Sequence, residues 1–199
     1  DVVLEIGTGT GSLTEVLCQK AAKVISCELD PDLWRDASSK LSQYRNLMLI
    51  QGDGFKFKRR FDVFVSNLPY SESSRFVQWL LSQRFKRAVV TVQKEFAEKL
   101  LALPGERIYR AISVMAQAGF RIEPVYEVSS HAFHPPPKVS SKILLLKPRR
   151  DRRLTDDTIL WLKKLFSFRG RKVYAALKAF SKKEGFSVES IDKSIRALA

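Results

Sequence analysis

The feature that most constrains the fold of this sequence is a regular alternation of short apolar runs, rich in β-branched residues, with longer amphipathic stretches. Such alternation is typical of βαβ units, in which parallel strands form a sheet and helices cover its two faces. The apolar runs predict strands at residues 2–6, 23–29, 47–51, 61–66 and 87–92. The amphipathic stretches predict helices near residues 12–20, 31–42, 74–84, 95–103 and 110–117, the last of them stopped by Gly119.

Two longer extended runs follow, at residues 121–129 and 139–147, on either side of a segment that contains Pro135, Pro136 and Pro137. Consecutive prolines lack amide donors and restrict their neighbours, so this segment cannot be helical. Adjacent extended runs at the end of an α/β series fit a final antiparallel strand. The sequence therefore predicts an α/β fold with a mixed seven-stranded sheet whose last strand is antiparallel.

The last quarter of the chain differs from the rest in charge and in pattern. Lys and Arg outnumber Asp and Glu by 35 to 21 in the whole chain, and by 15 to 6 from Lys147 to Ala199. A basic linker at residues 147–153 precedes three helical patterns near residues 156–168, 172–183 and 188–198. We therefore predict a catalytic domain at residues 1–152 and a small helical domain at residues 153–199. The excess of positive charge favours a polyanionic partner through phosphate contacts and counterion release. A merely soluble basic protein and an anionic membrane surface remain as alternatives.

Other residue counts exclude some classes of protein. No apolar run approaches the roughly 18–20 residues of a membrane span, and no secretory leader is visible, so we expect a cytoplasmic protein. Cys18 and Cys27 lie in a helical and a strand pattern and are expected to be buried free thiols. His131 and His134 lack a second pair of ligands, so no metal site is predicted.

A glycine-rich turn, Gly-Thr-Gly-Thr-Gly at residues 7–11, closes the first predicted strand and precedes a predicted helix. Glycines let the backbone approach a ligand closely, although dinucleotide enzymes use similar turns. Carboxylates at Glu5, Glu28 and Asp53 suit the sulfonium and ribose hydroxyls of S-adenosylmethionine, and suit a diphosphate poorly. Glu28 is also open to interpretation as a helix-capping or solvent-exposed carboxylate, and Asp53 as a turn former. The residues predicted to bind the cofactor are Glu5, Gly7, Gly9, Gly11, Glu28, Leu29, Asp53, Gly54 and Asn67.

The tetrapeptide Asn67-Leu68-Pro69-Tyr70 ends the fourth predicted strand and supplies what an exocyclic amine requires. The Asn67 side-chain oxygen and the Leu68 carbonyl can accept the two N6 hydrogens of adenine and aim the nitrogen lone pair at a methyl group. Tyr70 can stack on the base, and Phe133 is a candidate for its opposite face. Both rings are also open to a role in the core. The four residues of the tetrapeptide, Asn67, Leu68, Pro69 and Tyr70, are the predicted catalytic set. The predicted chemistry is methyl transfer to an amino group.

Together these motifs resemble the adenine N6,N6-dimethyltransferases of small-subunit ribosomal RNA. The resemblance covers nearly the whole chain and is most specific where Asn-Leu-Pro-Tyr at residues 67–70 combines with Phe-His-Pro-Pro-Pro-Lys-Val-Ser at residues 133–140. It includes residues 5–11, 28–30, 52–53 and 92–95. It continues into residues 166–172, which look like the family's basic helical motif.

The resemblance implies a Rossmann-like S-adenosylmethionine methyltransferase fold. It also implies N6,N6-dimethylation of two adjacent adenosines near the 3′ end of small-subunit rRNA, within an assembling ribosomal particle. Tyr70, Phe133, Arg169, Arg171 and Lys172 would then contact the RNA, and a monomer is expected. Members usually carry a segment before the first strand that closes over the cofactor, whereas this chain begins at Asp1. The alternatives are a methyltransferase of large-subunit rRNA or of DNA adenine, and a non-catalytic RNA-binding assembly or transcription factor.

Overall fold

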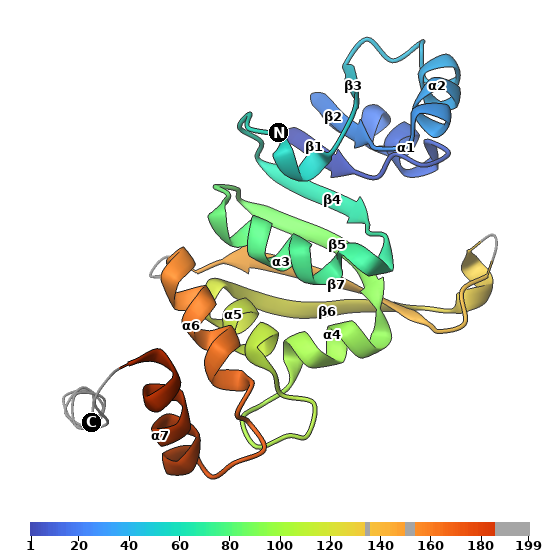
Figure 1. The fold of residues 1–199 in the computed structure, drawn as a ribbon. Helices are drawn as coiled ribbons and strands as arrows, with labels where there is room; N and C mark the ends of the chain where they lie inside the picture. Colours follow the sequence, from blue (N-terminus) through green and yellow to red (C-terminus); the bar gives the residue numbers. More distant parts are fainter. Residues whose placement is uncertain (134–135, 150–153, 186–199) are drawn as a thin grey trace. The chain divides into compact units, whose positions relative to one another are not determined.

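The computed structural model describes residues 1–133, 136–149 and 154–185, and its chain divides into two compact units. The first unit is Asp1–Arg153 and the second is Leu154–Ala199. Figure 1 shows the first unit as a sheet with helices packed against it. The division falls next to the basic run at residues 147–153.

The first unit is built on a seven-stranded sheet with the strand order β3-β2-β1-β4-β5-β7-β6. β1 to β5 are parallel, whereas β7 pairs antiparallel with both β5 and β6. This arrangement confirms the predicted mixed sheet with an antiparallel last strand. The strands are β1 Val2–Ile6, β2 Lys23–Glu28, β3 Leu47–Gln51, β4 Val63–Asn67, β5 Arg87–Gln93, β6 Phe120–Val128 and β7 Ser141–Pro148.

Helices cover both faces of this sheet because the strand order reverses direction at β1. Right-handed crossovers place the helices after β1 and β2 on one face and the helix after β4 on the other. Asp30 caps α2 by accepting hydrogen bonds from the backbone N–H groups of Asp32 and Leu33, and Pro31 occupies the first helical position. The helices are α1 Ser12–Lys20, α2 Pro31–Lys40, α3 Ser73–Ser82, α4 Lys94–Leu101 and α5 Ala111–Gly119, and the short 3₁₀ turns are η1 Gly54–Lys56, η2 Tyr70–Glu72 and η3 Ser130–Ala132.

The core between the sheet and α3 is largely aromatic. Phe64 and Phe76 are fully buried and stack with ring centroids 5.6 Å apart, and Trp79 packs against Phe64 at 5.3 Å. Gly119 ends α5 as predicted, and the reason is steric. A Cβ at this position would lie 2.1 Å from Cδ2 of Leu81 on α3. Close packing of α5 on α3 therefore requires a glycine here.

The second unit contains two described helices, α6 Asp156–Phe166 and α7 Val173–Glu184. Thr155 caps α6, and Trp161 packs edge-on against the buried ring of Phe180 at 5.2 Å. The ammonium of Lys164 pairs with Glu184 at 2.5 Å and so ties the two helices together. The third helix predicted here, at residues 188–198, lies outside the described residues. Among the helices that the structure describes, none is both long and apolar enough to span a membrane.

Candidate active site

A cavity of about 550 Å³ lies at the carboxyl ends of the parallel strands, where the strand order reverses between β1 and β4. Open α/β sheets bind their ligands at this type of position. The cavity brings together residues of the turn after β1, the end of β2, the end of β4 and the loop before β7. Among the predicted site residues it is lined by Gly7, Gly9, Glu28, Asn67, Leu68, Pro69 and Phe133.

The glycine-rich turn forms one wall of this cavity. Gly7, Gly9 and Gly11 have φ angles of 85°, 54° and 78°, a region that side chains rarely allow. A Cβ at Gly7 would also touch Pro69 Cδ at 3.8 Å and the Asn67 carbonyl at 4.0 Å. The turn after β1 therefore lies directly against the tetrapeptide after β4. Gly11 does not line the cavity; it precedes α1, where a Cβ would lie 3.0 Å from Leu41 Cδ1.

Glu28 ends β2 and is buried, yet it lines the cavity. Its Oε2 accepts a hydrogen bond from the Gly9 backbone N–H at 2.8 Å, and its Oε1 accepts one from the Asp30 N–H at 3.0 Å. Because Asp30 caps α2, Glu28 is neither the helix cap nor a solvent carboxylate. A carboxylate offers about four acceptor positions, so Glu28 can hold the turn and still accept from a ligand.

The prediction that Glu5 contacts the cofactor is corrected by the structure, because the Glu5 carboxylate does not line the cavity. Its side chain is fully buried beneath the glycine-rich turn, and its Oε2 accepts hydrogen bonds from the hydroxyls of Thr14 and Ser26, both at 2.6 Å. The Ser26 hydroxyl in turn bonds the Thr8 hydroxyl at 2.6 Å, and Thr8 lines the cavity. We call Glu5, Thr14, Ser26 and Thr8 the floor network. It stabilises the turn from below instead of binding a cation directly.

Burial also changes the protonation of Glu5. Desolvation raises the pKa of this carboxyl, and although the hydroxyls of Ser26 and Thr14 act in the opposite direction, the pKa reaches about 7. Oε1 of Glu5 has no hydrogen-bond partner among the described residues. Burial therefore favours the protonated form of Glu5 over its charged carboxylate form at this position.

Asp53 follows β3 and does not line the cavity. Its Oδ1 caps η1 by accepting from the Phe55 N–H at 3.0 Å, which agrees with the turn-forming interpretation, and its Oδ2 pairs with Arg75 at 2.5 Å. Partial burial raises the pKa of Asp53, but the hydrogen bonds from Arg75 and Phe55 and the charges of Arg75 and Lys56 outweigh it, so the pKa lies below its usual value. No sequence motif indicates the contact between Asp53 and Arg75. The neighbouring Gly54 packs against the end of β1, where its Cβ would lie 2.7 Å from Ile6.

The tetrapeptide after β4 is held by its second residue. The Leu68 side chain is buried, and its N–H donates to the Thr91 carbonyl at 3.3 Å, while the Asn67 side chain is exposed at the cavity. The Pro69 carbonyl accepts from Glu72 at 2.9 Å and so begins the turn that leads to α3. The backbone around Asn67 is therefore fixed by packing and hydrogen bonds on both sides. The side chain of Tyr70 lies outside the described part of the structure.

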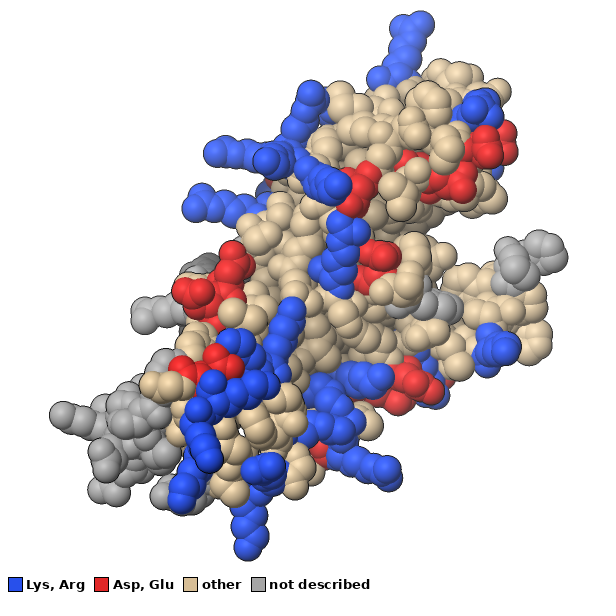
Figure 2. All heavy atoms as spheres, in the orientation of Figure 1, with Lys and Arg blue, Asp and Glu red and all other residues tan. Residues whose placement is uncertain are grey.

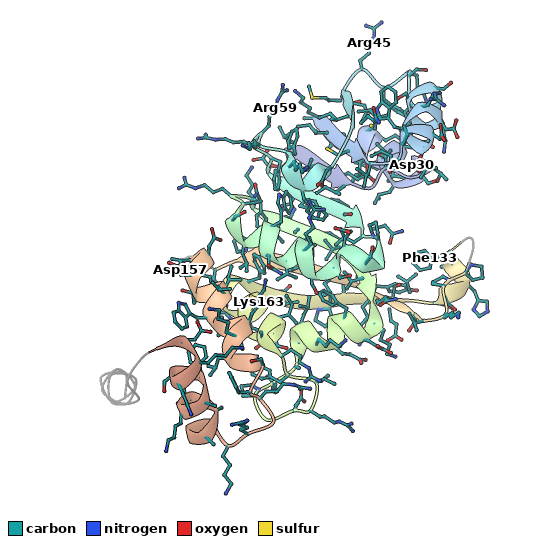
Figure 3. The ribbon with its side chains drawn as sticks, viewed as in Figure 1. Asp30, Arg45, Arg59, Phe133, Asp157 and Lys163 are labelled. Carbon is teal, nitrogen blue, oxygen red and sulfur yellow. The ribbon has the colours of Figure 1, made fainter. Side chains whose placement is uncertain are left out.

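The remaining predicted residues are distributed more widely. Phe133 lies in the loop between β6 and β7 and is labelled in Figure 3. Leu29 follows Glu28 and is exposed but does not line the cavity. Arg169, Arg171 and Lys172 are all exposed in the turn between α6 and α7 of the second unit. Residues that sequence reasoning missed in the cavity are Thr8, Thr10, Ser12, Leu13, Leu33 and Pro137.

The strand order and this cavity define a Rossmann-like fold of the methyltransferase class. A dimethyladenosine transferase from Plasmodium falciparum has a similar structure, with a TM-score of 0.80 and 36% identity, covering 89% of this chain and 67% of that one. The 23S rRNA methyltransferase ErmE is similar with a TM-score of 0.70 and 30% identity, covering 89% of this chain and 75% of that one.

The family described as ribosomal RNA adenine dimethylase matches residues 1–194, and this chain belongs to that family. A probable ribosomal RNA small subunit methyltransferase A of Pyrococcus abyssi is 41% identical over 89% of this chain and 65% of its own length. A protein of the same name from Thermococcus gammatolerans is 38% identical over 100% of this chain and 71% of its own length. The chain therefore spans about two thirds of the length of these curated relatives.

Proposed function

We propose that this chain takes part in S-adenosylmethionine-dependent N6,N6-dimethylation of two adjacent adenosines near the 3′ end of small-subunit rRNA. The observation that carries this proposal is the single cavity in which the glycine-rich turn, Glu28 and the Asn67-Leu68-Pro69 segment meet. Membership of the ribosomal RNA adenine dimethylase family supports it. The relatives named for the small subunit and the higher TM-score of the dimethyladenosine transferase favour it over a large-subunit substrate.

The residues around the cavity fit this cofactor. Its volume of about 550 Å³ lies in the range of small-molecule sites. Gly7 and Gly9 would let the backbone approach the ligand, and Glu28 would accept hydrogen bonds from the ribose hydroxyls with its free acceptor positions. When bound, S-adenosylmethionine supplies a methyl group activated by a sulfonium. Asp53 lies outside the lining of the cavity. With the cofactor's adenine extending past the cavity to the end of β3, Asp53 would accept a hydrogen bond from its amino group, and Arg75 would hold the Asp53 carboxylate in place.

The tetrapeptide positions the target amine. The Asn67 side-chain oxygen and the Leu68 carbonyl would accept its two hydrogens, which leaves the nitrogen lone pair directed into the cavity. Burial of the Leu68 side chain fixes these acceptors before the substrate arrives, so that orientation contributes most of the catalysis. A strong general base is not needed, because the amine becomes acidic only as the new N–C bond forms, and its proton can then leave to the Asn67 region or to water. Tyr70 and Phe133 would hold the base between them.

We propose further that residues 1–152 are the catalytic domain and residues 153–199 an RNA-binding domain that acts on an assembling small subunit as a monomer. Arg169, Arg171 and Lys172 support this assignment, since all three are exposed in one turn. Such a turn can contact several phosphates of the RNA backbone. Changing the three residues to glutamine should lower the salt dependence of particle binding.

The test of the function is transfer of labelled methyl groups to undermethylated small ribosomal subunits, with large subunits as the comparison substrate. We expect label on two adjacent adenosines of the small subunit and its loss in Asn67→Ala, with RNA affinity little changed. Gln19→Ala is the matched control, because this amide is exposed on α1 and does not line the cavity. Binding of the subunit with no cofactor uptake would instead support a non-catalytic assembly factor. Label on large subunits alone would overturn the assigned substrate.

A further inference from the structure

The loop between β3 and β4 carries a concentrated positive charge. Lys56, Lys58, Arg59 and Arg60 follow one another within residues 54–61 with no acidic residue among them, and all four are exposed. We call these four residues the basic loop. Figure 3 shows Arg59 pointing away from the sheet, and Lys and Arg side chains project at the same place in Figure 2.

The carboxylates that flank this loop already have partners. Asp53, before the loop, pairs with Arg75 at 2.5 Å, and Asp62, after it, pairs with Lys86 at 3.1 Å. Within the described part of the chain, no carboxylate forms an ion pair with any residue of the basic loop. The charge of Lys56 acts on Asp53 without forming an ion pair. The four neighbouring cations repel one another, so they contribute little to folding as partners of acidic groups.

Both ends of the loop are fixed on one side chain. Phe55 packs edge-on against Trp79 of α3 at 5.5 Å, and the buried Phe61 stacks on the same indole at 5.9 Å. The N–H of Lys56 donates to Asp53 and that of Phe57 to Gly54, which closes the first turn of the loop. The cations therefore lie on a short segment whose two ends are anchored in the core, so little order must be gained when a ligand binds.

A groove of about 620 Å³ runs beside the loop and is lined by Phe55, Lys56, Phe57 and Lys58 of the loop and by Trp79, Ser82 and Gln83 of α3 and its end. The loop begins at Asp53 and Gly54, next to the end of β1, and ends at the start of β4. It thus leads from the edge of the sheet that carries the candidate active site toward the opposite edge. A groove edged by lysines, with hydroxyl and amide groups opposite, matches a sugar–phosphate backbone.

We propose that the basic loop is a second RNA-contact surface, located on the catalytic unit itself, that binds the phosphate backbone of the RNA whose adenosine enters the cavity. This inference rests on the proposed RNA substrate but is separate from the methyl-transfer chemistry and from the cationic turn of the second unit. Its ligand is the RNA backbone, so it contributes affinity without reading the sequence.

The test compares two fourfold variants with the same change in charge. The loop variant replaces each residue of the basic loop by glutamine. The control replaces four exposed basic residues elsewhere in the first unit, which are Lys20, Arg35, Arg107 and Arg121. Binding is measured over a range of salt concentrations, both to a transcript of the 3′-terminal domain of small-subunit rRNA and to intact small subunits.

We expect the slope of log K against log salt to fall by about 3 in the loop variant, since each phosphate contact contributes about 0.7–0.9. Affinity at moderate salt should fall more than tenfold, and the control should change the slope by less than one. Equal losses in both variants would overturn the inference, because the effect would then be one of net charge. Loss of binding to subunits with transcript binding unchanged would also overturn it and would indicate a protein partner.

Thermal unfolding and cofactor binding of the loop variant show whether it remains folded, because its substitutions lie outside the cavity. The failures of the two proposals are distinguishable. RNA binding that depends on the loop without any methyl transfer supports the loop and refutes the function. Normal methylation and a normal salt slope in the loop variant refute the loop and leave the function standing.

Discussion

Glu5 and Glu28 come from adjacent strands beside the same glycine-rich turn, and the structure gives them opposite surroundings. Glu28 lines the cavity and accepts backbone hydrogen bonds from Gly9 and Asp30. Glu5 lies fully buried in the floor network, where hydroxyl groups satisfy one of its oxygens. The difference shows that a carboxylate at a strand end beside a glycine-rich turn identifies the site but does not by itself identify the ligand-binding residue.

Among these predictions, the largest effect is expected from removing Glu28, the carboxylate that lines the cavity. Glu28→Ala should lower S-adenosylmethionine affinity by about 100-fold or more, because hydrogen bonds to charged groups contribute about 1.5–3 kcal/mol each and two would be lost. Equilibrium titration of the cofactor measures this effect, and Glu28→Gln should retain part of the affinity. An unchanged affinity in Glu28→Ala would mean that the ribose binds elsewhere.

Removal of the buried carboxylate should act on stability instead. Glu5→Ala leaves the hydroxyls of Thr14 and Ser26 without their acceptor in a dry environment and opens a cavity. The free energy of unfolding should fall by about 2–4 kcal/mol, as measured by denaturant titration. Cofactor affinity of the folded variant should fall much less than in Glu28→Ala. A larger loss of affinity than of stability would give Glu5 the direct role that its burial contradicts.

The raised pKa of Glu5 gives a second test of its buried position, through the pH dependence of the free energy of unfolding. Its pKa is about 7 in the folded protein against 4.5 for the free group, so between these values the folded state binds more protons than the unfolded state. Stability from this group is fully present below pH 4.5 and is lost as the pH rises through 7. Between pH 5 and pH 7 the loss is about 2 kcal/mol.

Other groups titrate in the wild-type protein, so the measurement is a difference. Glu5→Gln keeps the shape of the side chain but cannot titrate. Its unfolding free energy should therefore change less between pH 5 and pH 7 than that of the wild type. Parallel stability profiles for the two proteins would show that Glu5 does not carry the proton in the folded state.

Asp53 is more exposed than either glutamate, and it pairs with Arg75. Arg75→Gln should cost no more than about 1 kcal/mol of stability, because the guanidinium is half exposed and surface pairs contribute little. It should weaken cofactor binding only a few-fold, through poorer positioning of Asp53. Arg84→Gln is the control, as an exposed arginine beyond the end of α3. Equal effects of the two substitutions would show that Arg75 acts only through net charge.

Much of the fold follows from local pattern. The predicted helix at residues 12–20 agrees with α1 at both ends, and the glycine-rich turn and the tetrapeptide both fall at strand ends as expected. Parallel strands place their carboxyl ends at one edge, so sequence alone brings residues 7–11 and 67–70 together. β4 begins at Val63 and not at residue 61, and Phe61 packs against Trp79 and Phe64 from the loop before the strand.

Other contacts depend on segments that are distant in the sequence. Leu33 reaches the cavity from α2, and no local motif marks it. Pro137 reaches the cavity from the β6–β7 loop, and the proline-rich motif that contains it does not indicate this position. Arg75 pairs with Asp53 across 22 positions of the chain. Such pairings depend on how helices and loops pack, and the periodicity of one segment carries no information about them.

The sequence by itself determined the order of strands and helices along the chain and the edge at which the site lies, because apolar periodicity and glycine-rich turns act locally. The resemblance of its motifs indicated the family. Only the tertiary structure decided which carboxylates line the cavity. Glu5 and Glu28 are the same residue type near the ends of neighbouring strands. Packing of α1 brings the Thr14 hydroxyl against Glu5 and seals it from water, whereas Glu28 stays open to the cavity.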